Sequence, residues 1–200
     1  MSSPWISIWL EPRKTIQSII DRDPEYMVLA LAALSGISEA LDKASTKNLG
    51  DQVGMPALLG ICLVGGIFSG LVGLYFFAFL IRVAGGWLGG TGKSGHLRTA
   101  IAWAAVPSIA SMLLWIPEYW LFGHELFSAE TPRIDSQPFL FLPFALAELV
   151  LAIWSLVILC KGIGQVHGFS AWRGLSAMII AVLVIAVPIL ALALGIAFVT

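Results

Sequence analysis

Long apolar stretches almost free of charge dominate the chain and predict membrane-spanning helices. Four stretches carry at most one charged residue each: 52–81, 99–117, 136–160 and 174–200. The single charge among them is Glu148. A helix needs about 20 mostly apolar residues to cross the hydrocarbon core of a bilayer, and a charge near its centre is costly. The pattern therefore predicts at least four spans.

The segment 26–41 is a fifth candidate span. It is shorter than the other four and contains Glu39 near its end, so hydropathy alone does not decide whether it crosses. Its start is well marked, because Asp23 is a favourable N-cap, Pro24 suits the first helical position and Glu25 favours the helix N-terminus. We expect this helix to begin near residue 24.

The distribution of Lys and Arg favours a crossing of this fifth segment. These residues collect in short cytoplasmic loops. With five spans, the side that holds the N-terminus has eight of the eleven Lys and Arg, and the other side has Lys43, Lys47 and Arg133. With four spans the two sides are nearly equal. We therefore predict a cytoplasmic N-terminus and five spans, at about 24–41, 57–82, 99–121, 138–160 and 175–199.

The predicted fold class is an all-α polytopic transmembrane bundle with two parts. Residues 1–22 form an amphipathic segment, and residues 23–200 form the five-helix domain. Large apolar residues recur in the first part every three to four positions, as expected for helices lying on the cytoplasmic leaflet: Trp5, Ile8, Trp9, Ile16, Ile19 and Ile20. Pro12 is placed to begin a second short helix there.

Composition narrows the possible functions. Hydrophobic residues make up 58% of the chain and charged residues 12%, the mean hydropathy is +0.92, and the formal charge is −1. No basic field is available to attract nucleic acid, so nucleic-acid binding is excluded and the lipid bilayer is the expected environment. Cys62 and Cys160 stand alone in apolar runs, which favours buried thiols. We expect no catalytic constellation, cofactor or metal site.

Glycine and proline mark places where spans pack closely or bend. Gly66 and Gly70 form a GxxxG step, which permits close helix contact within the bundle or with another protomer of a homo-oligomer. Pro107 and Pro188 each remove a backbone donor from the middle of a span. We expect a kink at both prolines, and such kinks can act as hinges.

Glu148 is the most distinctive polar residue, because it lies at the centre of the fourth span. A carboxylate there is expensive and should face protein. It is either a protonatable site in an ion or solute pathway, or a neutral acid that hydrogen-bonds to a neighbouring helix. No basic residue is placed at the same depth to pair with it.

Acidic residues also gather at the far end of the first span. Glu39 and Asp42 share a helix face, and Lys43 follows Glu39 by one turn, so a local ion pair is available. The alternative is a divalent cation site that also uses Asp51. Together with Glu118, these acids are expected to form an acidic external surface.

The order of several motifs resembles the Yip1-domain family, in particular its bacterial branch. The matching residues of the first third of the chain are Trp5, Glu11, Pro12, Arg13, Thr15, Ile16, Asp23, Pro24, Gly36, Ile37, Asp42, Asn48, Leu49 and Gly50. Those of the third span are Arg98, Thr99, Ala100, Ala102, Trp103 and Pro107. The resemblance implies a five-helix membrane domain with a cytoplasmic N-terminus, in a bacterial inner membrane.

Two hypotheses of function follow. The first is a non-enzymatic membrane protein that acts by membrane organisation or protein interaction. The second is a small ion or solute transporter that uses Glu148. Eukaryotic relatives are associated with Rab GTPases, but this chain has no long cytosolic N-terminal region, so Rab binding is not expected to carry over.

Overall fold

The computed structural model describes residues 3–199 and is helical throughout, with no strand among those residues. The elements in chain order are α1 (Pro4–Leu10), α2 (Pro12–Arg22), α3 (Val28–Thr46), the 3-10 turn η1 (Leu49–Asp51), α4 (Met55–Trp87), α5 (Ser94–Ala104), α6 (Val106–Ser111), α7 (Trp115–Phe122), the 3-10 turn η2 (Gly123–Phe127), α8 (Pro132–Ser136), α9 (Pro138–His167) and α10 (Ala171–Val199).

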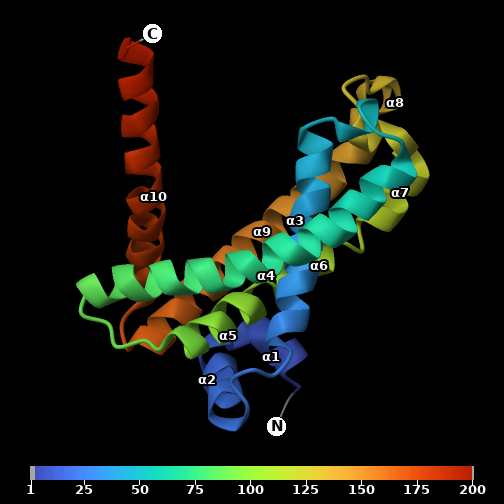
Figure 1. The fold of residues 1–200 in the computed structure, drawn as a ribbon. Coiled ribbons are helices and arrows are strands. Elements are labelled where there is room, and N and C mark those ends of the chain that lie inside the picture. Colours follow the sequence, from blue (N-terminus) through green and yellow to red (C-terminus); the bar gives the residue numbers. More distant parts are fainter. Residues whose placement is uncertain (1–2, 200) are drawn as a thin grey trace.

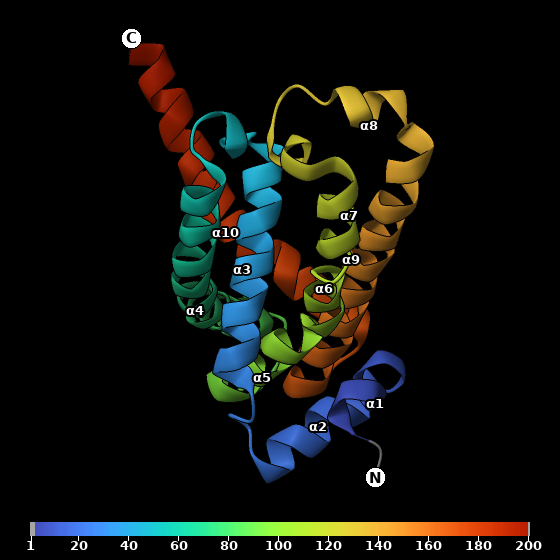
Figure 2. The same cartoon turned by 90° about the vertical axis from the view of Figure 1, so that its right-hand side faces the viewer.

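The long helices form an open bundle with different structures at its two ends (Figures 1 and 2). We call the end that holds α1 and α2 the lower end, and the end that holds η1, η2 and α8 the upper end. Within the described residues, four helical segments are long and apolar enough to cross a membrane: Met55–Trp87, Ser94–Phe127, Pro138–His167 and Ala171–Leu194. The expectation of an all-helical polytopic protein is therefore confirmed.

Helix α3 is the remaining long helix, and it begins later than the sequence predicts. A turn occupies residues 24–27, and the helix starts at Val28 because Met27 has a left-handed backbone conformation with φ of 57°. The Asp23 carboxylate accepts a hydrogen bond from the Glu25 N–H at 3.1 Å and so organises the turn. At its other end α3 continues past residue 41 to Thr46, supported by the Glu39–Lys43 ion pair.

Helices α3 and α4 touch through glycine backbones. A Cβ atom on Gly70 would lie 2.9 Å from the Gly36 Cα atom, and one on Gly66 would lie 2.7 Å from the Ile37 Cα atom. Neither distance leaves space for a side chain. The GxxxG step of α4 therefore packs against α3 of the same chain, at the Gly36–Ile37 step.

The third predicted span is a broken helix. Helix α5 ends at Ala104 and α6 begins at Val106, so that Pro107 lies in the first turn of α6, where its missing N–H is least costly. The Ser108 N–H and hydroxyl both donate to the Ser155 hydroxyl of α9, at 3.0 and 2.8 Å. The break at Pro107 thus exposes a backbone donor that binds α9.

The N-terminal segment is two helices that pack under the bundle. Helix α2 begins at Pro12, as its sequence predicts. Ile8 and Ile16 are fully buried, and they belong to the same apolar cluster as residues of α5 and α9. We expected the whole apolar face of this segment to contact a leaflet. The side chains that stay exposed, such as Ile6 and Leu10, are the ones that can make such contact.

Helix α10 is attached to the bundle at its base and diverges from it above (Figure 1). Gly174 lies against the Cys160 carbonyl of α9, and Ala177 and Ala181 are buried among residues of α4 and α9. From Val182 to Leu194, every side chain except that of Ile185 is exposed. The helix continues without interruption through Pro188.

Replacing Gly70 with Leu should destabilise the fold, because the new side chain would overlap the α3 backbone. Overpacking of this kind costs about 1–3 kcal/mol, and the clash with backbone favours the upper value. Thermal unfolding in detergent, followed with a thiol-reactive dye that reports exposure of the buried Cys62 and Cys160, measures the loss. Gly65→Leu on the same helix is the control, since a Cβ at Gly65 meets nothing within 4 Å. Equal melting temperatures for the two variants would contradict the assignment.

Candidate functional site

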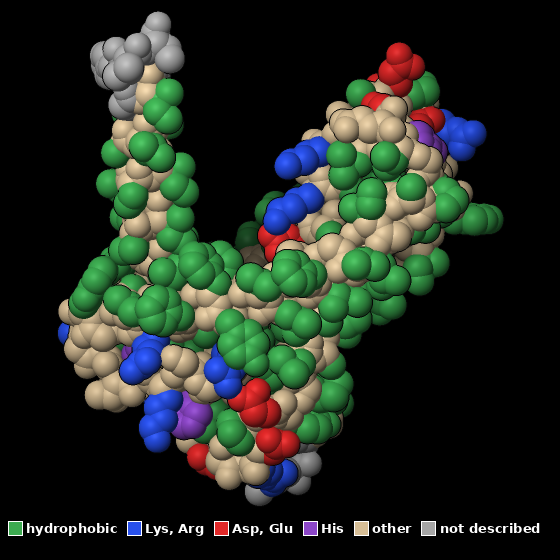
Figure 3. Space-filling view, viewed as in Figure 1, with side chains coloured by type: hydrophobic (Ala, Val, Ile, Leu, Met, Phe, Trp, Pro, Cys, Tyr) green, Lys and Arg blue, Asp and Glu red, His purple; other side chains and the backbone are tan. Residues whose placement is uncertain are grey.

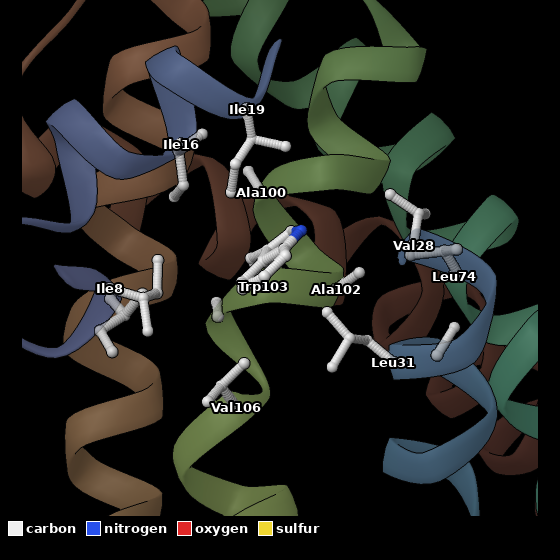
Figure 4. Close-up of a cluster of buried hydrophobic side chains, with 13 residues drawn as sticks. Ile8, Ile16, Ile19, Val28, Leu31, Leu74, Ala100, Ala102, Trp103 and Val106 are labelled. Atoms are coloured by element: carbon white, nitrogen blue, oxygen red, sulfur yellow. The ribbon is translucent and has the colours of Figure 1, made fainter. Parts of the chain in front are cut away.

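Trp103 of α5 lies at the centre of the lower end of the bundle. Its side chain is fully buried, with Ile8 and Ile16 of the N-terminal helices to one side and Leu31 of α3 to the other (Figure 4). The indole ring stacks on Tyr26, with ring centroids 5.9 Å apart, and it meets Trp5 at 4.9 Å. One aromatic side chain thus joins α1, α2, α3 and α5.

Side chains of α5 satisfy the backbone of the turn that precedes α3. The Thr99 hydroxyl donates to the Pro24 carbonyl, and the Trp103 indole N–H donates to the Tyr26 carbonyl at 3.1 Å. Thr99 is fully buried. These carbonyls lie outside any helix, so the two donors replace the bonds that a longer α3 would have made.

Arg98 adds an electrostatic link to the same turn. Its guanidinium group forms an ion pair with Glu25 at 2.6 Å and lies over the Tyr75 ring of α4, 4.8 Å from the ring centroid. The Arg98 side chain is 21% exposed, so its ion pair is better shielded from water than the exposed pairs Glu11–Lys14 and Glu39–Lys43. Arg98 therefore ties α5 to both the α3 turn and α4.

Polar contacts also fix the N-terminal helices to α9 and to the loop that follows it. The Arg13 guanidinium donates to the Phe169 carbonyl at 3.1 Å, and the Trp154 indole donates to the Trp9 carbonyl at 3.1 Å. The Gln165 amide donates to Gln17 at 3.1 Å. The segment before residue 23 is thus part of the folded domain.

His167 closes the lower loop between α4 and α5. The side chain is 3% exposed, its Nδ1 atom accepts a hydrogen bond from the Gly92 N–H at 3.1 Å, and its ring stacks on Phe169. Because Nδ1 accepts, the neutral ring carries its proton on Nε2. Gly85 and Gly90 lie so close to this ring that neither position has space for a Cβ atom.

The upper end is held by two short turns that contact each other. In η1 and η2 the Gly50 carbonyl lies 3.1 Å from His124 Nε2, and the Asp51 carboxylate accepts a hydrogen bond from the Ala129 N–H at 2.8 Å. Asn48 has a left-handed conformation with φ of 51°, which turns the chain out of α3. The Ser45 hydroxyl donates to the Leu126 carbonyl at 2.6 Å.

Three carboxyl groups from three helices in the upper half are close enough to interact electrostatically. Glu148 of α9 and Asp42 of α3 both act electrostatically on Glu118 of α7, a helix that lies between α3 and α9 (Figure 2). Glu118 is 3% exposed, so our expectation that it lies on the external surface is wrong. Among residues 3–199, none of the three carboxylates has a hydrogen bond or an ion pair. The charged groups that act on Glu118 and Glu148 are therefore acids.

The sequence pattern gives little sign of the burial of Glu118. An uncharged stretch ends at Pro117, so counting charges places Glu118 just beyond a span. The aromatic residues on both sides of it are the available signal, because Trp115 and Phe122 anchor this turn of α7 in an apolar cluster.

Glu39 and Asp42 share a helix face but differ in their partners. Glu39 pairs with Lys43 at 2.7 Å, as the helical spacing predicts, and both side chains are exposed. Asp51 is bound to Ala129, as described above. No group of three or more His, Cys, Asp or Glu side chains within the described part of the chain is spaced to hold a metal ion. The structure therefore contains the local ion pair between Glu39 and Lys43.

These features define a class of protein: an all-helical integral membrane protein whose N-terminal segment is folded onto the bundle. A family model, that of the Yip1 domain, matches residues 6–193, which is nearly the whole chain. The chain therefore belongs to the Yip1 domain family. No curated protein and no solved structure matches it.

The family resemblance noted in the sequence has a structural basis. Several of the matching residues meet in the cluster around Trp103, although they are far apart in the chain: Trp5, Ile16, Pro24, Arg98, Thr99 and Ala100. The matching Gly36 forms the α3–α4 contact, and the matching Asn48–Gly50 forms the upper turn. These residues hold the fold together.

Trp103→Phe should loosen the N-terminal helices from the bundle. The substitution removes the donor to the Tyr26 carbonyl and part of a fully buried ring, which together cost about 2–4 kcal/mol. Hydrogen exchange of residues 4–22 and the melting temperature in detergent measure the effect. Trp120→Phe is the matched control, because Trp120 is 85% exposed, and it should leave both unchanged. Unaltered exchange in Trp103→Phe would refute this role.

Proposed function

We propose that the protein is a non-enzymatic integral membrane protein that acts by protein interaction and membrane organisation within the bilayer. The observation that carries this proposal is the free upper part of α10. In that part of the described chain, from Val182 to Leu194, apolar side chains are exposed around almost the whole helix. A helix that diverges from its own bundle presents both flanks to neighbouring molecules.

The partner that suits this helix is the α10 of a second copy of the chain. In the sequence, Ala191 and Gly195 are four residues apart, a spacing of small residues that permits close contact between membrane helices. The same surface on two copies can pair around a two-fold axis, the commonest symmetry of oligomers. The GxxxG step of α4 is already occupied by α3 of the same chain, so it is not the surface we propose for association.

The proposal includes a membrane topology. Helix α3 has 19 residues and is therefore about 28 Å long, close to the thickness of the hydrocarbon core. It contacts α4 along the Gly36 region, which supports a fifth span. The excess of Lys and Arg on the side of α1 and α2 supports a cytoplasmic N-terminus in a bacterial inner membrane.

Hinge roles for Pro107 and Pro188 belong to the same proposal. Pro107 lies beside the break between α5 and α6, and Pro188 lies within the free part of α10. A bend at Pro188 would change the direction of the association surface without moving the base of α10.

Disulfide cross-linking in native membranes tests the association surface. Leu192→Cys places a thiol on the free part of α10, where Leu192 is 67% exposed, and an oxidant should convert much of the protein to a covalent dimer. Leu149→Cys on α9 is the control, since Leu149 is 55% exposed but lies on a helix packed in the bundle. The native cysteines are buried and should not cross-link. Absence of the dimer, or equal yields from both variants, would contradict the proposal.

A flux measurement separates this function from transport. Liposomes containing the wild-type protein should show the same proton permeability under a pH gradient as liposomes containing Glu148→Gln, because the proposed function gives Glu148 no role in moving protons. A fluorescent pH indicator inside the liposomes measures the permeability, with protein-free liposomes as the baseline. Proton flux that is present in the wild type and lost in the variant would instead establish transport through Glu148.

A further inference from the structure

A cavity of about 440 Å³ lies where α10 leaves the bundle. Helices α3, α4, α9 and α10 and the α5–α6 break all contribute to its wall, which is mostly apolar. Its volume is within the range of about 300–1,000 Å³ that is typical of small-molecule sites. Protein interiors are close-packed and rarely leave such a space empty.

Small side chains and one hydrogen-bonded pair create the cavity. Gly73 of α4, Ala105 at the α5–α6 break and Ala181 of α10 line it from three directions. The wall also includes Ser108 and Ser155, whose mutual hydrogen bonds hold α6 against α9. Helix α10 diverges from the bundle immediately above Ala181. The cavity therefore opens toward the gap between α10 and the bundle.

A charged pair lies at the upper edge of this apolar space. Glu39 is part of the cavity wall, and its carboxylate pairs with Lys43 at 2.7 Å, with both side chains more than 60% exposed. Figure 3 shows positive and negative side chains on the side of the bundle that faces α10, above an apolar surface. The site is therefore amphipathic, with apolar walls below and one charge of each sign at its rim.

We infer that this cavity binds an acyl chain of a bilayer phospholipid whose zwitterionic head group lies against Glu39 and Lys43. The acyl chain occupies the space lined by Gly73 and Ala181. The Lys43 ammonium donates to the phosphate, and the Glu39 carboxylate accepts hydrogen bonds from the primary ammonium of the head group. Each charge of the lipid thus meets its opposite on one turn of α3.

The charge balance of α3 favours a zwitterionic head group over an anionic one. The last turns of this helix and the residue that follows it carry two acids and two bases: Glu39, Asp42, Lys43 and the C-cap residue Lys47. A net negative lipid would find no excess positive charge there, whereas phosphatidylethanolamine has one charge of each sign. Water is a poor occupant, since apolar cavities do not hold it well.

This inference is independent of the proposed self-association. The lipid site uses the base of α10 up to Val182, which borders the cavity, while association uses the part of α10 above Val182, around Ala191 and Leu192. Cross-linking of Leu192→Cys measures the second, and the lipid labelling below measures the first, so that the failure of either is distinguishable.

The test is photolabelling of the full-length protein in liposomes with phosphatidylethanolamine that carries a diazirine on an acyl chain. Labelled peptides should come from the cavity-lining residues of α4 and α10, near Gly73 and Ala181. Gly73→Leu should lower this labelling at least tenfold, because the four added carbon atoms displace several methylene groups of the lipid and the loss of two already gives about a tenfold change. It should fold, since a Cβ at Gly73 meets only a Phe77 ring atom, at 4.0 Å.

Gly65→Leu is the matched control, because the same substitution on the same helix lies outside the cavity and has open space around it. Its labelling should equal that of the wild type. Val182→Trp fills the cavity from the exposed side of α10 and replaces Gly73→Leu if that variant fails to fold. Equal labelling of a folded cavity-filling variant and the control would overturn the inference.

The head-group arm compares the same probe with a phosphatidylglycerol probe of identical chains. The wild type should be labelled more strongly by the phosphatidylethanolamine probe, and Glu39→Gln and Lys43→Gln should each reduce that preference. Glu11→Gln is the control, because Glu11 forms a similar exposed ion pair with Lys14 at the other end of the protein. Equal labelling of the wild type by both probes would overturn the head-group assignment.

Discussion

The short turn before α3 is the constraint on which the lower half of the molecule depends. Residues 24–27 leave the helical path, so their carbonyls need donors from elsewhere. Thr99 and Trp103 supply these donors from α5, and Arg98 adds an ion pair to Glu25. Trp103 also packs against the N-terminal helices. The hydrogen bonds to this one turn therefore fix the positions of α2, α3 and α5 relative to one another.

The four long spans could be predicted because membrane insertion acts on each segment separately. The length of an apolar stretch is enough to identify a spanning helix, and the predicted span 57–82 lies within α4, which extends beyond it at both ends. The start of α3 could not be predicted in the same way. Asp23 has the composition of an N-cap, but the turn it actually supports depends on donors about 75 residues away in the chain.

The candidate site shows the same division between local and distant information. Gly66 and Gly70 indicate close packing from the sequence. Their partner Gly36 has no such motif around it, so its role becomes visible only in the contact between the two helices. Glu148 is visible as an isolated acid in an apolar helix, whereas Glu118 is hidden at the end of an uncharged stretch. The packing of α7 between α3 and α9 brings these acids together, and periodicity carries no information about that packing.

The attachment of α10 at its base makes this helix a lever. Its fixed point is the contact between Gly174 and the Cys160 carbonyl, where no side chain separates the two backbones. The part from Val182 to Leu194 extends for about 20 Å without support from the bundle. A small rotation at the fixed point becomes a large lateral displacement of the upper end. A molecule bound between α10 and the bundle would therefore set the distance between the upper end of α10 and the other helices.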